Sequence, residues 1–236
     1  FGSRDGVRCV LVLAVPAPMD EMEQLLGETG LPEEDEDAGG AGMACVLMTV
    51  PRLMCLGIAF LIYRFGDRNH YRERMALLAS WDLGFLYLCV VVFSILVQWL
   101  NVYPTVHKKK LNLKGDLQAN MQFFKVNRIA GPRLPYVVLE DEGTIGEYNR
   151  ANRSLFHFTE NMGGVILCIV CAGFVFHIPT FVCTLAFAIG RVAHQIDYSQ
   201  GGHGEHARGY VLNLFCALTL EGLVTVVALG IFGIIW

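Results

Sequence analysis

One uncharged apolar run constrains the fold of this chain more than any other feature. The run LGFLYLCVVVFSILVQWL, residues 83–100, contains no charged side chain. About 20 consecutive apolar residues form a helix long enough to cross the ~30 Å hydrocarbon core of a bilayer. Trp99 and Tyr103 lie at the end of the run, where an interfacial aromatic belt is expected, and Pro104 ends it. The run therefore predicts a membrane-spanning helix.

Three further apolar segments extend this prediction to a four-transmembrane-helix bundle within residues 80–236. They cover residues 146–176, 177–198 and 207–236. As a single helix, residues 146–176 would be about 46 Å long, which exceeds the hydrocarbon core. Its polar first half is therefore expected to project from the membrane or to face a cavity lined by protein. The short connection FHIP predicts an antiparallel hairpin with the segment that follows.

The N-terminal part of the chain has a different composition. Residues 1–42 include the acidic stretch MDEMEQLLGETGLPEEDED, which is typical of a poorly structured, solvated tail. Residues 43–79 form a helical extension in this interpretation, and Pro51 and Arg52 interrupt its apolar part. An interfacial helix and an additional membrane span both remain open for residues 43–63.

The overall composition agrees with an all-α membrane protein. Of the 236 residues, 54% are hydrophobic and 17% are charged, and the mean hydropathy is +0.45. The net charge of −4 gives no reason to expect a nucleic-acid partner. The chain is therefore expected to be an integral membrane protein with the lipid bilayer as its main environment.

Two helical faces carry polar side chains that are expensive to place in a membrane. Spacing of three or four residues puts side chains on one face of a helix. One face contains Asn149, Arg153, His157 and Glu160, and the other contains Arg191, His194 and Tyr198. The predicted hairpin brings both faces to the same side of the membrane. Because arginine binds carboxylates in a bidentate manner, the two faces favour a site for an anionic ligand.

Two other interpretations of these polar residues remain open. The first is an internal network of ion pairs, Arg153 with Glu160 and Arg191 with Asp197, which would only satisfy itself. The second is a metal site formed by His157 and Glu160 on one helix and His194 and Asp197 on the next, with His203 and His206 as further ligands. Carboxylate-bridged sites in bundles need more glutamates, and Glu221 is the only additional candidate in these helices. We therefore expect no metal.

Glu221 itself raises a separate question because it lies midway along the segment 207–236. A carboxyl group within a membrane helix is a functional candidate by default. The alternative is a protonated glutamate that hydrogen-bonds to Gln98 or to a partner chain.

The motifs resemble the MAPEG family, the membrane-associated proteins of eicosanoid and glutathione metabolism that include microsomal glutathione transferases and prostaglandin E synthases. The resemblance rests on GRVAH followed by Tyr198, on YNRANRSLFHFTE, and on YSQG followed by Ala207 and Arg208. It covers roughly residues 80–236. It implies a four-helix fold, a homotrimer with sites between subunits, and a lipophilic second substrate that arrives from the bilayer.

The resemblance also implies roles for individual residues. Glutathione would be the co-substrate. Its binding positions would be Arg153, His157, Glu160, Arg191, His194 and Tyr198, and the catalytic positions would be Arg208, which stabilises the thiolate, and Tyr198. The expected activity is that of a glutathione transferase, peroxidase or eicosanoid-type isomerase in the endoplasmic reticulum or in a mitochondrial or plastid membrane.

This sequence departs from the family pattern at three adjacent positions. His157 replaces an asparagine, Leu155 replaces a histidine, and Phe156 replaces a residue that is usually polar. These changes remove part of the polar wall that the family uses. They motivate an alternative from another functional class, a non-catalytic MAPEG-fold subunit of a larger membrane complex.

Overall fold

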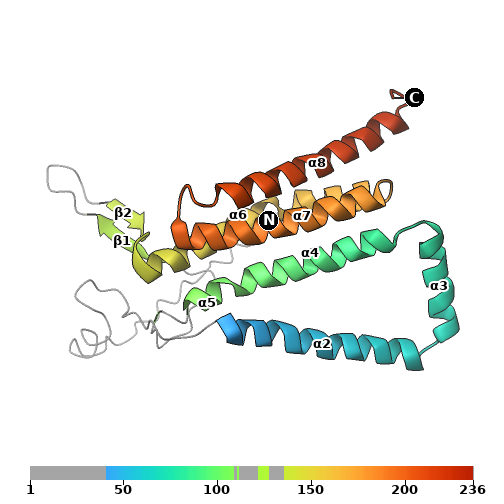
Figure 1. Ribbon diagram of the computed structural model, residues 1–236, viewed down its shortest axis with the longest axis horizontal. Helices are drawn as coiled ribbons and strands as arrows, with labels where there is room; N and C mark the ends of the chain where they lie inside the picture. Colours follow the sequence, from blue (N-terminus) through green and yellow to red (C-terminus); the bar gives the residue numbers. More distant parts are fainter. Residues whose placement is uncertain (1–40, 109–110, 112–121, 128–135, 236) are drawn as a thin grey trace, which may run out of the picture.

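The computed structural model describes residues 41–108, 111, 122–127 and 136–235, and the expectation of an acidic tail falls almost wholly outside them. Long helices lie roughly side by side in the described part (Figure 1). The helices are α2 (Ala41–Phe65), α3 (Arg68–Ser80), α4 (Gly84–Val102), α5 (Pro104–Lys108), α6 (Gly143–Gly173), α7 (His177–Gly201) and α8 (Ala207–Ile231). The strands are β1 (Phe124–Asn127) and β2 (Tyr136–Leu139).

Within the described residues, four helical segments are long and apolar enough to cross a membrane. They are Met48–Phe65, Gly84–His107, Gly143–Gly173 and Ala207–Ile231. This confirms the predicted all-α membrane fold with four helices of membrane-spanning length. The four segments differ from the four predicted ones in one respect: the segment in α2 is long and apolar enough, and α7 is not. The last turns of α7 carry Arg191, His194 and Asp197, which lower its mean hydropathy.

Helix α7 lies at the centre of the bundle and packs against α4, α6 and α8. The turn from α6 to α7 contains only residues 174–176, so these helices form the antiparallel hairpin that the sequence predicts. Phe93 of α4 joins the elements, because its ring lies 6.0 Å from the ring of Phe158 and 6.3 Å from that of Phe187, measured between centroids. The buried core therefore connects α4, α6 and α7.

Two glycines set the separation of α7 and α8. A Cβ atom on Gly209 would lie 2.3 Å from the backbone nitrogen of His194 and 2.7 Å from the carbonyl oxygen of Gly190. A Cβ atom on Gly190 would lie 2.9 Å from the backbone nitrogen of Asn213. Small residues allow membrane helices to approach this closely, and van der Waals contact between backbones then holds them together. The polar end of α7 is thereby held against the first turns of α8.

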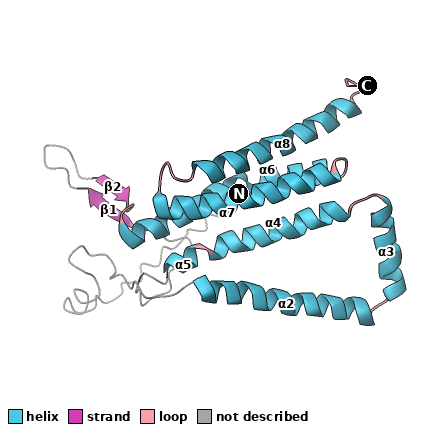
Figure 2. Cartoon of the chain, in the orientation of Figure 1, coloured by secondary structure: helices cyan, strands magenta, loops and turns pink. Residues whose placement is uncertain are grey.

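A small β-sheet lies beside the start of α6, at the polar end of the bundle (Figure 2). Strands β1 and β2 pair antiparallel, with Phe124 opposite Leu139. Asn149 connects this sheet to α6: its amide donates to the carbonyl oxygens of Phe123 (2.9 Å) and Glu140 (2.7 Å), and its Oδ1 accepts from the backbone N–H of Phe123 (2.9 Å). A buried side chain with all these bonds fixes the start of α6 relative to the sheet.

Arg150 anchors the end of α7 to α6 at the same end of the bundle. Its Nε donates to the carbonyl oxygen of Ser199 at 3.0 Å, and a terminal nitrogen donates to the carbonyl oxygen of Gln200 at 3.4 Å. These carbonyl groups belong to the last turn of a helix, where backbone acceptors lack partners within the helix. The turn between α7 and α8 therefore starts from a fixed position.

Helix α2 lies outside this core. None of the residues in its apolar segment Met48–Phe65 is buried. The guanidinium of Arg52 in α2 donates a hydrogen bond to Oε1 of Gln98 in α4 at 2.8 Å. Figure 1 shows α2 and α4 joined through α3 at one end of the molecule. An apolar helix without a protein cover is what contact with lipid requires.

Candidate functional site

A cavity of about 440 Å³ lies between α6, α7 and α8. Its walls are mostly apolar, and a few polar groups are placed among them, which is typical of small-molecule sites. The apolar lining consists of Phe158, Met162, Val165, Cys168, Phe187, Leu214, Ala217 and Leu218, together with Gly164. The polar lining consists of His157, Asn161, Arg191, Tyr210, Asn213 and Glu221.

Arg191 is the most deeply buried charged group of this cavity, with 2% of its surface exposed. One terminal nitrogen donates to the carbonyl oxygen and the hydroxyl of Ser154, the latter at 2.9 Å, and the other donates to Nδ1 of His194. The guanidinium also lies 5.5 Å from the ring centroid of Phe158. In the described part of the chain no carboxylate lies within ion-pair distance of Arg191. Its positive charge is therefore not neutralised by a described side chain.

The bond from Arg191 determines the tautomer of His194. A guanidinium only donates hydrogen bonds, so Nδ1 of His194 must be the acceptor. His194 is therefore neutral in this arrangement and carries its proton on Nε2. Ser154 supports the same geometry, because its hydroxyl lies 3.2 Å from Nδ1 of His194. The imidazole can donate one hydrogen bond to a ligand or neighbour from its other nitrogen.

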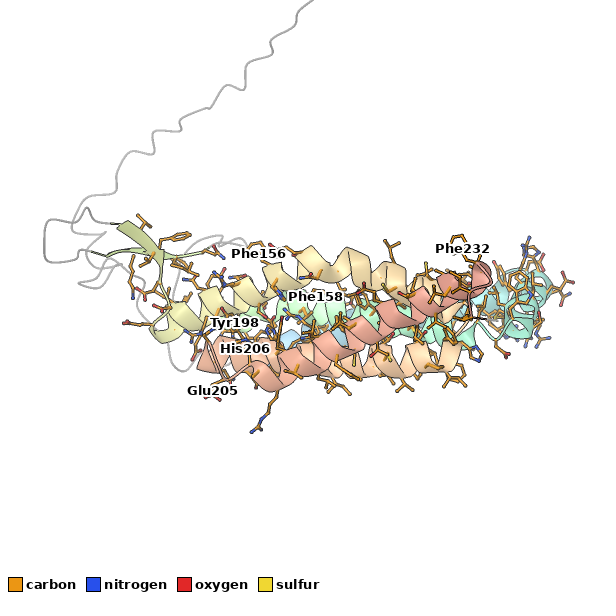
Figure 3. The ribbon with its side chains drawn as sticks, turned by 90° about the horizontal axis from the view of Figure 1, so that it is seen from above. Phe156, Phe158, Tyr198, Glu205, His206 and Phe232 are labelled. Carbon is orange, nitrogen blue, oxygen red and sulfur yellow. The ribbon has the colours of Figure 1, made fainter. Side chains whose placement is uncertain are left out.

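Aromatic and imidazole rings surround His194 on the side of the α7–α8 turn. Its centroid lies 5.8 Å from the ring of Tyr198, with the planes nearly parallel at 6°, and 5.1 Å from the ring of His206. Tyr210 at 5.9 Å and His157 at 6.2 Å complete the group. Figure 3 shows Tyr198 and His206 near the same end of the bundle, and their ring centroids are 5.0 Å apart. Of these rings, those of His157 and Tyr210 line the cavity.

Two buried donors on cavity-lining residues have no hydrogen-bond partner within the described part of the chain. They are Nε of Arg191 and Nδ2 of Asn213, and the whole Asn213 residue is 9% exposed. A buried donor without a partner loses its hydration and gains nothing in return. Both atoms belong to residues that line the cavity.

The structure brings four of the residues proposed from the sequence together. Arg191 and His194 are in direct contact, and the rings of His157 and Tyr198 flank His194. His157 also lines the cavity. The two predicted polar faces therefore converge at these four residues.

Three other proposed residues lie elsewhere in the single chain. Arg153 and Glu160 are exposed on α6 and do not line the cavity. Arg208 is exposed at the start of α8, where it borders a surface depression with Asp197 and Glu205. These three side chains are available to other molecules and take no part in the Arg191 cluster.

The alternatives weighed from the sequence have different outcomes. Among the described residues, neither Arg153 with Glu160 nor Arg191 with Asp197 forms an ion pair, so the self-satisfied network is wrong. Among the described residues, the side chain of Gln98 hydrogen-bonds to Arg52 and Ser94 and not to Glu221. The described part of the chain contains no group of three or more potential metal ligands.

Ser154 and Tyr210 contribute to the site, and sequence reasoning did not select them. Ser154 lies three residues before His157, which puts both side chains on one helical face. Tyr210 lies four residues after His206, and both rings lie near that of His194. Helical spacing from the two histidines is the signal that points to them.

Comparisons with known proteins provide no further assignment. No family model, no curated protein and no solved structure matches this chain.

Proposed function

We propose that this chain is a glutathione-dependent membrane enzyme that acts on a lipophilic electrophile. The observation that supports the proposal is the buried guanidinium of Arg191, which lacks a carboxylate among the described residues and lines a largely apolar cavity. A cation in such a position favours an anionic group, because no described side chain neutralises it. The apolar walls favour a lipophilic second substrate.

The chemistry of a thiol co-substrate suits a site that contains cations. The thiol of glutathione is mostly protonated at neutral pH, and a nearby cation lowers the pKa of a thiol and so increases the fraction of nucleophilic thiolate. In the transferase form of the proposed reaction, the sulfur forms a bond to an electrophilic carbon, the leaving group departs with the electron pair of the broken bond, and the thiol proton passes to solvent. In the peroxidase form, two glutathione molecules reduce a peroxide to an alcohol and water and are themselves oxidised to the disulfide. Arg208 would stabilise the thiolate, and Tyr198 would donate a hydrogen bond to it.

The exposed residues fit a homotrimer in this proposal. Arg153 and Glu160 on α6 and Arg208 on α8 are accessible in the single chain. A site between neighbouring subunits can use them for the carboxylates and the ammonium of glutathione. The membrane would be that of the endoplasmic reticulum or of a mitochondrion or plastid.

One observation supports a second candidate, a non-catalytic subunit of a larger membrane complex. Both terminal nitrogens of Arg191 already donate to groups of this chain, Ser154 and His194. A guanidinium that is bonded in this way also serves as an internal brace between α6 and α7. In that case Arg191 would stabilise the bundle without binding an anion.

Titration calorimetry with glutathione separates the two candidates. The purified chain in lipid nanodiscs is titrated with glutathione, and the absorbance of the thiolate is recorded in parallel. We expect saturable heat and a thiolate signal for the natural chain, and loss of both for Arg191→Gln. Arg191→Lys keeps the charge, and we expect it to retain part of the binding. Arg74→Gln removes an exposed arginine of α3, far from the site, and serves as the matched control.

Two results would reject the enzyme proposal. The first is the absence of both heat and thiolate signal at saturating glutathione in the natural chain. The second is unchanged binding in Arg191→Gln that is folded according to circular dichroism. The oligomeric state adds a further criterion, since a free homotrimer agrees with the enzyme and a single copy in a hetero-complex agrees with the subunit.

A further inference from the structure

The cavity contains a carboxyl group whose partner is missing. Glu221 lines it from α8, and in the described part of the chain its side chain forms neither an ion pair nor a hydrogen bond. The residue is exposed, so it lies where the cavity opens to the surroundings of the bundle. Charged groups midway along a membrane helix are costly unless another group neutralises them.

The unpartnered groups nearer the polar end have the opposite hydrogen-bonding character. Nδ2 of Asn213 and Nε of Arg191 are both donors, and both residues are at least nine-tenths buried. Donors in a dry cavity are satisfied by acceptor oxygens such as those of an ester, an amide or a carboxylate. Two residues with unsatisfied donors thus line one end of the cavity, and a carboxyl group lines the other end.

The spacing of the two ends follows from the geometry of α8. Asn213 and Glu221 belong to the same continuous helix, and a rise of 1.5 Å per residue separates them by about 12 Å. Leu214, Ala217 and Leu218 line the cavity between them. An apolar chain therefore fits between the two polar ends.

From this arrangement we infer that the cavity binds a lipophilic amine that carries an acceptor oxygen about 12 Å from its nitrogen. The ammonium pairs with Glu221 at the opening, the chain lies along the apolar wall, and the oxygen accepts from Asn213 and Arg191. An ammonium neutralises the carboxylate, whereas a hydroxyl would leave its charge in place. This ligand class does not require glutathione, so the inference goes beyond the proposed function.

Three probes of equal chain length test the inference. Methyl ω-aminodecanoate carries both the amine and the ester, methyl decanoate lacks the amine, and decylamine lacks the ester. Binding to the full chain in nanodiscs is measured by calorimetry, with empty nanodiscs as the blank. Reaction of Glu221 with a hydrophobic carbodiimide, followed by peptide mass spectrometry, provides a second measurement of occupancy at the same residue.

Each variant has a distinct expected result. Glu221→Gln should weaken binding of methyl ω-aminodecanoate about tenfold and leave methyl decanoate unchanged. Asn213→Ala should weaken both esters and leave decylamine unchanged. Glu205→Gln removes a carboxylate from the surface depression beside the α7–α8 turn and should change none of the affinities. Methyl ω-aminodecanoate should also protect Glu221 from the carbodiimide.

Other outcomes would overturn the inference. Equal affinities for methyl ω-aminodecanoate and methyl decanoate would show that Glu221 does not recognise an amine. A Glu221 that is unreactive toward carbodiimide before any probe is added would show that another copy or a partner covers it. Glutathione calorimetry on Glu221→Gln distinguishes the two proposals, because we expect this variant to bind glutathione normally. Binding of the amine by a natural chain that does not bind glutathione would refute only the enzyme proposal.

Discussion

Replacement of Gly209 by alanine tests whether the contact of α7 with α8 organises the site. The new Cβ atom would lie 2.3 Å from the backbone nitrogen of His194 and 2.7 Å from the carbonyl oxygen of Gly190. These distances are about an ångström shorter than ordinary van der Waals contact. Because the opposing atoms belong to the backbone, no side-chain rotation relieves the overlap, and the two helices must separate.

The expected cost follows from the overlap and from a matched control. Overpacking of this kind costs about 1–3 kcal/mol, and contact with backbone atoms favours the upper end of that range. Gly222→Ala is the control, because a Cβ atom there meets nothing within 4 Å and lies in the same helix. Both changes gain up to about 1 kcal/mol of helix propensity, so the difference between them isolates the overlap.

Thermal unfolding in detergent, followed by circular dichroism, measures this difference. For a chain of this size 1 kcal/mol corresponds to about 2–4 °C, so Gly209→Ala should melt roughly 5–10 °C below Gly222→Ala. The separation should also move Tyr210 away from His194, whose ring centroids are 5.9 Å apart, and weaken ligand binding. Equal melting temperatures for the two variants would refute the proposed role of this contact.

Two further predictions concern the polar end of the bundle. Burial raises the pKa of the Glu140 carboxyl, but bonds from Lys125 and from the two backbone N–H groups that follow outweigh burial and hold the pKa below its ordinary value. The contribution of Glu140 to the free energy of unfolding is complete above the unfolded pKa of about 4.3 and is lost as the pH falls through the lower pKa of the folded state. Glu140→Gln should remove this acid dependence from melting temperatures measured over a series of pH values. Arg150→Ala should cost about 1.5 kcal/mol through loss of the bond to Ser199 and should accelerate hydrogen exchange in the α7–α8 turn. Arg153→Ala, on the exposed face of the same helix, should leave that exchange unchanged, and equal rates in the two variants would contradict the anchoring role.

Local sequence already determines the main helices of this chain. The predicted run 83–100 corresponds to α4, Gly84–Val102, and the segment 146–176 corresponds to α6, Gly143–Gly173. Length and continuous apolar character suffice for this, because in a bilayer the backbone must satisfy its own hydrogen bonds and a helix does so within one segment. The hairpin of α6 and α7 follows from the short connection. The β1–β2 pair was not predicted, since its contacts depend on Asn149 in α6.

The composition of the site could be predicted only in part. Helical spacing placed Arg191 and His194 on one face, and the structure joins them by a hydrogen bond. The same reasoning placed Arg153 beside His157, and both are exposed, yet only His157 lines the cavity. Spacing relates side chains to the axis of their own helix, and it contains no information about how that helix is rotated toward its neighbours.

Sequence alone thus determined that the chain forms long membrane helices with polar groups on particular faces. Tertiary structure decided which of those groups are buried together. The close contact at Gly190 and Gly209 fixes the position of α8 against α7, and this contact brings Tyr210 and Asn213 to the cavity that Arg191 lines. A guanidinium on a helix surface is commonplace, and only the packing of three helices around Arg191 buries its charge where no described carboxylate neutralises it.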